Sequence, residues 1–236
     1  MSARQRSRLH VLRAPVVGGT LLTLALLPQV ARTETATGKI SGKVLLLANG
    51  KAKADAAGVV VYVVGYSEPP PAGVVPAVKQ KDKTFEPALL AITAGQKVSF
   101  PNFDSFFHNV FSLSPARKFD LGQFKKGESK TKEFPTPGVV DVYCNIHPQM
   151  ACTILVLPNR RFSTTSTDGA FVIDGVHVGA WNLFAYSRLA DKPVRAEVSV
   201  AANETTEISL SINETRSSTD HKNKYGERYR DPKKYR

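Results

Sequence analysis

The sequence predicts an all-β protein built from β-sandwiches, and two observations carry this prediction. Beyond residue 37, no stretch repeats its apolar residues at the 3.6-residue spacing of a helix. Short runs rich in β-branched and aromatic residues recur instead, and turn-forming pairs such as Pro137-Gly138 and Asp168-Gly169 separate them. Strands at this spacing are typical of sandwiches, and the length of the chain leaves room for two.

Ten runs of residues have this strand-like composition. They are Lys43–Leu47, Val59–Gly65, Leu89–Thr93, Lys97–Phe100, Val139–Tyr143, Thr153–Leu157, Ala170–Ile173, Asn182–Ala185, Glu197–Val200 and Glu207–Ile212. A stiff proline-rich stretch, Glu68–Gly73, interrupts the chain after the second run. The hydrophobic pattern ends at Ser217, so the basic segment 214–236 is expected to be a disordered tail.

Composition and charge exclude several classes of protein. The chain has 236 residues, of which 42% are hydrophobic and 22% charged, as in ordinary globular domains. The net charge of +12 is concentrated at the two ends: residues 1–31 hold four arginines and no acid, and residues 214–236 hold eight basic residues against four acids. The body between them is only modestly basic, which argues against nucleic-acid binding. Two cysteines cannot form a disulfide scaffold, and five histidines cannot supply several metal centres.

The N-terminus predicts export from the cytoplasm. Four arginines precede the apolar run Val16–Leu27, which has the length of a signal-peptide core and falls short of the roughly 20 residues that span a bilayer. Residues 1–31 are therefore predicted to be a signal peptide, with cleavage at a site between 31 and 36; an uncleaved membrane anchor is the alternative. No later run is apolar enough to span a membrane, so the mature protein is expected to be periplasmic or secreted.

The most informative motif is a short run of potential metal ligands. Cys144, His147 and Met150 follow a C-x2-H-x2-M spacing in a turn between two predicted strands, and His108 lies 36 residues before the cysteine. Two histidines, one cysteine and a weak methionine form the ligand set of blue-copper sites. Thiolate sulfur favours Cu(I) and imidazole suits Cu(II), so this mixture of ligands suits the transfer of single electrons.

Residues 75–158 resemble a cupredoxin, the small Greek-key β-sandwich of plastocyanin, azurin and amicyanin. The tract from Phe85 to Asp104 is similar to the family's strand, turn and strand that lead to its first histidine. Asn109 matches a position where the family often uses an asparagine to fix the ligand loop, and the short C-x2-H-x2-M loop is most similar to that of amicyanin.

This resemblance implies a ligand set and a function. His108, Cys144 and His147 would be the equatorial ligands of one type 1 copper ion, and Met150 would be the axial ligand. The protein would be an electron carrier that works with a redox partner protein. His147 would be the exit for the electron, because its outer edge can reach solvent.

A second resemblance covers the rest of the body. Residues 38–66 and 159–213 are similar to the two parts of a carboxypeptidase regulatory-like domain, a small transthyretin-like sandwich. The motifs that carry this resemblance are Ile40–Val44, Ala57–Val63, Thr167–Phe171 and Gly179–Leu183. The cupredoxin would then be inserted into this sandwich. Alternatively, residues 38–66 pair with the cupredoxin as its first strands.

Other functions remain open at this point. The same ligands would serve a copper carrier or chaperone, whereas a Cys144–Cys152 disulfide would leave a structural or adhesion scaffold with no metal. Zinc is disfavoured because methionine is a poor zinc ligand. No hydrolase motif or phosphate-binding loop occurs, and too few histidines exist for a multicopper oxidase, so we expect no enzymatic turnover.

Three features near these motifs have simpler expected roles. The phenylalanines around His108 are expected to be mostly core residues; they are Phe100, Phe103, Phe106, Phe107 and Phe111. His177 is expected to be an ordinary turn histidine. The basic tail with its interleaved tyrosines is solvated, or it binds an acidic partner or an anionic surface.

Overall fold

A computed structural model describes residues 35–216 and 221–229. Within these ranges, all regular secondary structure is β-strand. The all-β prediction is therefore confirmed. The predicted signal peptide, residues 1–31, lies outside the described residues. Within the part of the chain that is described, no helix has the length and hydropathy needed to cross a membrane.

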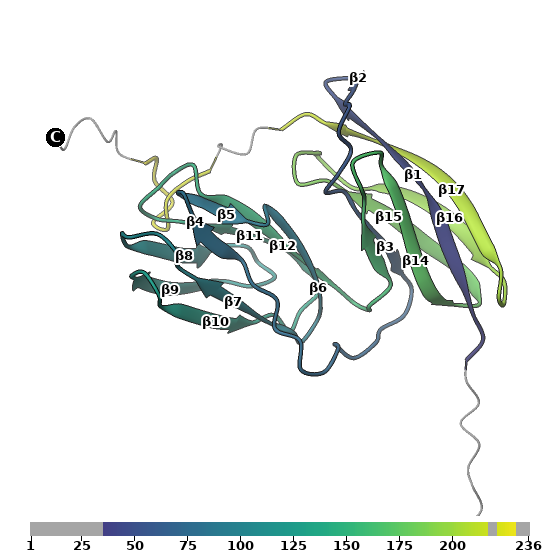
Figure 1. Cartoon of the computed structure of the whole chain (residues 1–236), viewed down its shortest axis with the longest axis horizontal. Helices are drawn as coiled ribbons and strands as arrows, with labels where there is room; N and C mark the ends of the chain where they lie inside the picture. The colour runs from purple at the N-terminus through teal and green to yellow at the C-terminus, as the bar shows by residue number, and fades with distance from the viewer. Residues whose placement is uncertain (1–34, 217–220, 230–236) are drawn as a thin grey trace, which may run out of the picture. The chain divides into compact units, whose positions relative to one another are not determined.

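The strands form two sandwiches, which we call central and terminal after their places in the sequence. The central sandwich contains β4 (Lys79–Lys81), β5 (Thr84–Glu86), β6 (Leu89–Thr93), β7 (Lys97–Pro101), β8 (His108–Ser112), β9 (Phe119–Phe124), β10 (Ser129–Glu133), β11 (Gly138–Tyr143) and β12 (Ala151–Leu157). Its main sheet has the order β6-β12-β11-β8-β9, and the pairs β10-β7 and β4-β5 lie outside this sheet (Figure 1).

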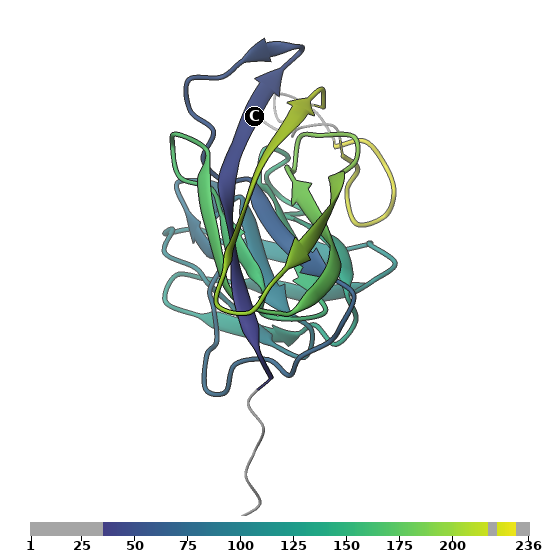
Figure 2. The ribbon, with the colours of Figure 1, turned by 90° about the vertical axis from the view of Figure 1, so that its right-hand side faces the viewer.

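The terminal sandwich takes its strands from both ends of the described chain. They are β1 (Thr37–Ala48), β2 (Lys51–Ala52), β3 (Val60–Val64), β13 (Phe162–Thr164), β14 (Ala170–His177), β15 (Gly179–Tyr186), β16 (Val194–Val200) and β17 (Thr205–Glu214). One sheet has the order β14-β1-β17, and the other has the order β13-β3-β15-β16. Strands β1 and β17 run in parallel side by side (Figure 2). The exact domain boundaries stay a prediction.

Strand β1 shows how the sequence builds the terminal core. Ile40, Val44 and Leu46 are buried on one face, whereas Leu45, between two of them, is 51% exposed. This alternation is the period-2 pattern of a half-buried strand. At the start of β14, Gly169 adopts a φ of +80°, and a Cβ there would lie 2.3 Å from the Val44 carbonyl oxygen, so the turn requires glycine.

Strands β3 and β12 are buried on both faces, which explains why their sequences are mostly apolar. On β3, Val61 and Val63 pack in the terminal core, while Val60 joins a separate apolar cluster. On β12, Ile154 packs in the central core, while Leu155 joins the same separate cluster as Val60. This shared cluster connects the two sandwiches through apolar contacts.

The ten predicted runs all fall on strands, but several strands were not predicted. Strand β8, which carries His108, is buried at all five positions and has no alternation to reveal it. Strand β10 alternates between exposed and half-buried residues, so its sequence is too polar to read as a strand. The tail also differs from the prediction of disorder, because residues 221–229 form turns and hydrogen bonds.

Candidate metal centre

Three of the four predicted ligands meet at one end of the central sandwich. His108 is the first residue of β8, and Cys144 and His147 lie in the loop of residues 144–150 between β11 and β12, which we call the ligand loop. One imidazole nitrogen of each histidine and the Cys144 sulfur all lie within 4.8 Å of one another. The sequence prediction therefore placed residues 36 positions apart in a single cluster.

The distances between the donor atoms fit a metal ion. Cys144 Sγ lies 3.9 Å from His108 Nδ1 and 3.8 Å from His147 Nδ1, and the two Nδ1 atoms are 3.2 Å apart. The point equidistant from the three atoms is about 2.1 Å from each, which is close to the length of metal–nitrogen and metal–sulfur bonds in proteins. Three donor atoms this close repel each other unless a proton or a cation lies between them.

Met150 lies in the same loop and is fully buried. Its backbone N–H donates to the His147 carbonyl at 3.0 Å, and its carbonyl accepts from the Cys144 N–H at 3.2 Å. Its side chain belongs to the same core cluster as that of Cys144. These two hydrogen bonds close the loop and fix the spacing between Cys144 and Met150. In addition, the Ile146 N–H points at Cys144 Sγ at 3.4 Å and would stabilise a thiolate there.

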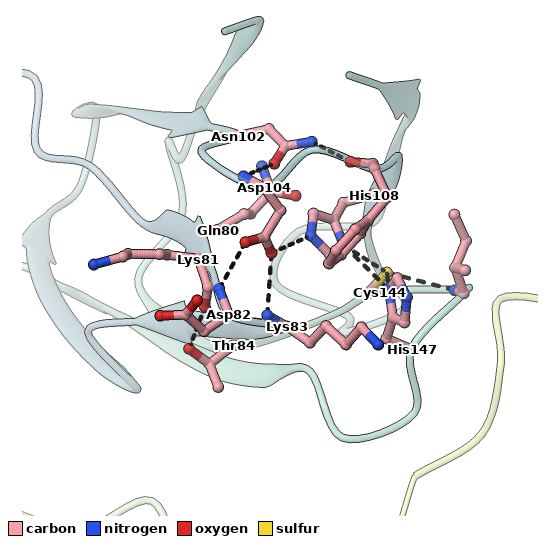
Figure 3. A network of polar contacts seen from close by, with 12 residues as sticks. Gln80, Lys81, Asp82, Lys83, Thr84, Asn102, Asp104, His108, Cys144 and His147 are labelled. Carbon is pink, nitrogen blue, oxygen red and sulfur yellow. Dashed lines mark hydrogen bonds and ion pairs between the residues drawn. The ribbon is translucent and has the colours of Figure 1, made fainter. Parts of the chain in front are cut away.

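A buried carboxylate orients His108. Asp104 Oδ2 lies 2.8 Å from His108 Nε2, and both side chains are buried (Figure 3). A carboxylate only accepts hydrogen bonds, so the ring proton lies on Nε2 and the Nδ1 lone pair faces Cys144. Asp104 also accepts the backbone N–H groups of Asp82 and Lys83, at 2.7 and 3.0 Å. Burial alone would raise the pKa of Asp104, but the hydrogen bonds from His108, Lys83 and Asp82 hold this pKa below its ordinary value.

Asn102 in turn fixes the loop that carries Asp104. Its side-chain oxygen accepts the Asp104 N–H at 2.9 Å (Figure 3). Its amide nitrogen donates to the carbonyls of Phe106 and Phe124. The roles of Asn102 and Asp104 were not predicted from the sequence. A carboxylate four residues before a candidate ligand was the only available signal, and spacing alone does not show which ring nitrogen it would contact.

His147 is the less buried of the two histidines. Burial, the neighbouring His108 and the cation of Lys83 lower the pKa of His147. The Phe106 ring packs against both histidines, with centroid distances of 5.2 Å to His108 and 5.5 Å to His147. Lys83 Nζ lies 5.3 Å from the centre of the same ring. The half-buried His147 ring therefore lies beside an apolar ring, that of Phe106, and near the positive charge of Lys83.

The predicted phenylalanine core is partly wrong. Phe100 and Phe111 are fully buried on β7 and β8. In contrast, Phe103, Phe106 and Phe107 are 52%, 37% and 53% exposed, because they belong to the loop between these strands and not to a strand face. Ile146 of the ligand loop is 40% exposed as well. We call these four exposed side chains the apolar rim.

Asn109 contacts a strand instead of the ligand loop. Its side-chain amide donates to Asp120 Oδ1 on β9 at 2.7 Å, so it ties β8 to β9 beside His108. From the family resemblance, Asn109 was expected to fix the ligand loop. Its hydrogen bond to Asp120 differs from that expectation. Its effect on the site is therefore indirect, through the position of β8.

The two cysteines are free thiols, so the bridge required by the scaffold alternative is absent from the structure. Cys152 on β12 is 1% exposed, and burial raises the pKa of its thiol far above the ordinary value. It is a small apolar core residue, as the sequence suggested. His177 lies at the end of β14 in the terminal sandwich, stacked on Tyr66 at 4.4 Å, and takes no part in the cluster.

Comparisons with known proteins give a partial likeness. No family model and no curated protein matches this chain. Over 40% of its length the chain is similar to a Cu-containing nitrite reductase (NirK) from Thermus scotoductus SA-01, with 24% identity and a TM-score of 0.35, and it spans only 25% of that chain.

Two smaller proteins share the likeness. A Cu(I) form of a mutant amicyanin has 21% identity and a TM-score of 0.34, over 41% of this chain and 98% of that chain. A purple cupredoxin from Nitrosopumilus maritimus has 23% identity and a TM-score of 0.32, over 35% of this chain and 99% of that chain. Scores this low do not assign a function, which must come from the donor atoms themselves.

Proposed function

We propose that this protein is an exported blue-copper protein, which holds one type 1 copper ion and carries single electrons between partner proteins. The ligands would be His108, Cys144 and His147, with Met150 in the axial position. One observation carries this proposal: two imidazole nitrogens and a cysteine sulfur lie within 4.8 Å of one another, and a buried methionine packs in the same core as the cysteine. Copper bound there would supply one-electron redox chemistry, for which this mixture of hard and soft donors is suited.

The surrounding residues would keep the site rigid. Asp104 fixes the ring of His108, and the backbone of the ligand loop fixes Cys144 relative to Met150. A site whose ligands are held by packing and hydrogen bonds changes little between two redox states, so electron transfer meets a low reorganisation barrier. Met150 would tune the reduction potential from its buried position.

His147 would be the route by which electrons leave and enter. It is the only half-exposed member of the three-residue donor cluster, and two exposed apolar side chains lie next to it: Phe106, which packs against its ring, and Ile146, its neighbour in the chain. Lys83 beside Phe106 gives this face a positive charge. We infer a partner protein with an apolar contact area and acidic residues at its edge.

A copper carrier is the second candidate function, because the two soft donors Cys144 and Met150 are both fully buried and suited to retaining Cu(I). The rate of copper loss separates the two functions. An electron carrier keeps its copper through repeated reduction by ascorbate and oxidation by ferricyanide. A copper carrier loses Cu(I) to a chelator within minutes.

The ligand assignment is tested with a matched pair of cysteine variants. Cys144→Ser should abolish the intense visible band that a copper–thiolate bond gives, while the protein remains folded by circular dichroism. Cys152→Ala should keep the band, since Cys152 is a packing residue of the same sandwich. A band that survives Cys144→Ser would overturn the proposal.

A further inference from the structure

The basic segment 221–229, near the C-terminus, lies on the ligand loop. Three of its residues hydrogen-bond to that loop, each at a different point. The Tyr229 hydroxyl donates to the carbonyl of Cys144 at 2.7 Å, and the Lys224 backbone N–H donates to Asn145 Oδ1 at 3.0 Å. These contacts span the loop from its cysteine ligand toward the second histidine.

The third contact lies beside the second histidine ligand. His221 Nε2 is 2.6 Å from the carbonyl oxygen of Pro148, the residue after His147. The His221 ring also stacks on Tyr143, the residue before Cys144, with a centroid distance of 4.1 Å and an interplanar angle of 17°. Tyr229 packs edge-on against the same imidazole at 5.2 Å. An aromatic cluster therefore supports the beginning of the ligand loop.

The segment also connects to the strand that carries the first histidine. Lys224 Nζ lies 2.8 Å from Asp120 Oδ2 on β9. The other carboxylate oxygen of Asp120 accepts the side-chain amide of Asn109, the neighbour of His108, at 2.7 Å. Through Lys224, the segment therefore contacts both the ligand loop and the network beside His108.

We propose that residues 221–229 are a clamp that holds the ligand loop in its metal-binding geometry, with Tyr229, His221 and Lys224 as positioning residues. This inference rests on the proposed copper site. The clamp touches no donor atom and acts by fixing the backbone on both sides of Cys144 and His147. Outer contacts of this kind typically change metal affinity by 10–100-fold when they are removed.

The test uses the copper-loaded full chain and a matched pair of tyrosine variants. Tyr229→Phe removes the hydroxyl that bonds to the Cys144 carbonyl and keeps the ring. Tyr225→Phe is the control, because that side chain is 71% exposed in the same segment. We expect Tyr229→Phe to accelerate Cu(I) transfer to bathocuproine disulfonate by about tenfold and to shift the visible band, and Tyr225→Phe to leave both unchanged. Equal rates and spectra for the parent and Tyr229→Phe would overturn the clamp.

A second experiment removes the whole segment and then adds it back as a peptide. A chain that ends at Arg216 lacks the whole segment, and we expect it to lose Cu(I) faster than Tyr229→Phe. A synthetic peptide of residues 217–236, added in excess, should slow the loss again. Loss at the parent's rate without the peptide would overturn the proposal.

A metal-free readout separates this inference from the proposed function. In the Cys152→Ala background, the only remaining thiol is Cys144, which is fully buried. If the clamp fixes the loop, Tyr229→Phe should increase the rate at which Ellman's reagent modifies Cys144, and Tyr225→Phe should not. A parent protein without a copper–thiolate band would refute the copper function. A parent with the band, together with unchanged thiol reactivity in Tyr229→Phe, would refute only the clamp.

Discussion

The two sandwiches are both built from β-strands, but they bury different kinds of side chain. The core of the terminal sandwich consists of apolar side chains such as Ile40, Phe171 and Leu183. The core of the central sandwich includes Cys144 and Met150, and most of the buried polar side chains of the described chain lie in or beside it. The terminal sandwich buries only a few polar side chains, such as Thr165, whereas the central one holds a whole cluster of them.

This difference shows what a buried polar cluster requires of a small β-sandwich. Buried polar groups destabilise a fold unless hydrogen bonds satisfy them. In the central sandwich, Asp104 accepts a hydrogen bond from the buried ring of His108. Asp104 itself is hydrogen-bonded to Asn102 and to the backbone N–H groups of Asp82 and Lys83. We therefore expect substitutions in the central sandwich to change both stability and metal binding, and substitutions in the terminal sandwich to change stability alone.

The largest expected effect comes from a matched pair of core truncations. Phe100→Ala in the central core and Phe171→Ala in the terminal core each remove a buried ring, so each should lower the free energy of unfolding by about 3–5 kcal/mol. Denaturant unfolding measures this loss. A copper titration at low temperature should show weaker binding only for Phe100→Ala. Equal weakening in both variants would contradict the expected difference between the two sandwiches.

The next effect concerns the carboxylate that orients His108. Asp104→Asn removes the charge that holds the His108 ring proton on Nε2, so copper affinity should fall by about 10–100-fold. Competition with a chelator measures the affinity. Asp174→Asn is the control, because Asp174 forms an exposed ion pair with Lys39 in the terminal sandwich. Unchanged affinity in Asp104→Asn would show that the carboxylate does not position the ligand.

A smaller effect with a distinct pH dependence is expected at Glu68. Burial would raise the pKa of Glu68, but hydrogen bonds and charge from Arg160 and Arg161 hold it below the ordinary value of 4.5. Because the folded-state pKa is lowered, the ionised carboxylate stabilises the fold above pH 4.5, and this contribution is lost as pH falls through the folded-state value.

Glu68→Gln should therefore cost about 1–3 kcal/mol of unfolding free energy at pH 7 and progressively less below pH 4.5. Urea unfolding at several pH values measures the difference between the variant and the parent. The visible copper band at pH 7 should stay unchanged, because Glu68 belongs to no part of the metal cluster. A constant difference across the whole pH range would contradict this account.

The smallest effect is expected at an exposed ion pair. Lys43 and Asp168 lie 2.9 Å apart, but their side chains are 65% and 57% exposed. Water and salt screen such pairs, so Lys43→Ala should change the unfolding free energy less than Glu68→Gln does. Thermal unfolding at low and high salt checks this, and a loss larger than that of Glu68→Gln would reverse the expected order.

The cluster of His108, Cys144 and His147 could be predicted because most of the candidate ligands lie in one short stretch of sequence. Cys144, His147 and Met150 share a single loop, and the prediction needed only His108 from elsewhere. Asp104 could not be predicted, because its role depends on which nitrogen of the His108 ring faces the cluster. Spacing does not specify that orientation.

The strands show a similar division. Runs that alternate, such as that in β1, were predictable from their period, and β3 and β12 were predictable from their apolar composition. Strand β8 could not be predicted, because all five of its positions are buried and its sequence therefore shows no alternation. The contacts of residues 221–229 were hidden for another reason: a basic, tyrosine-containing segment has no pattern that distinguishes a solvated tail from one fixed by single hydrogen bonds.

The proposed copper site is tested most simply by a Cu(II) titration of the metal-free protein, followed by its visible spectrum, with free thiols counted beforehand in denaturant. The account predicts two titratable thiols and an intense thiolate-to-copper band that saturates at one copper per chain. Ascorbate should bleach the band, and ferricyanide should restore it. Absence of the band, or of any titratable thiol, would contradict the assignment of a type 1 copper site.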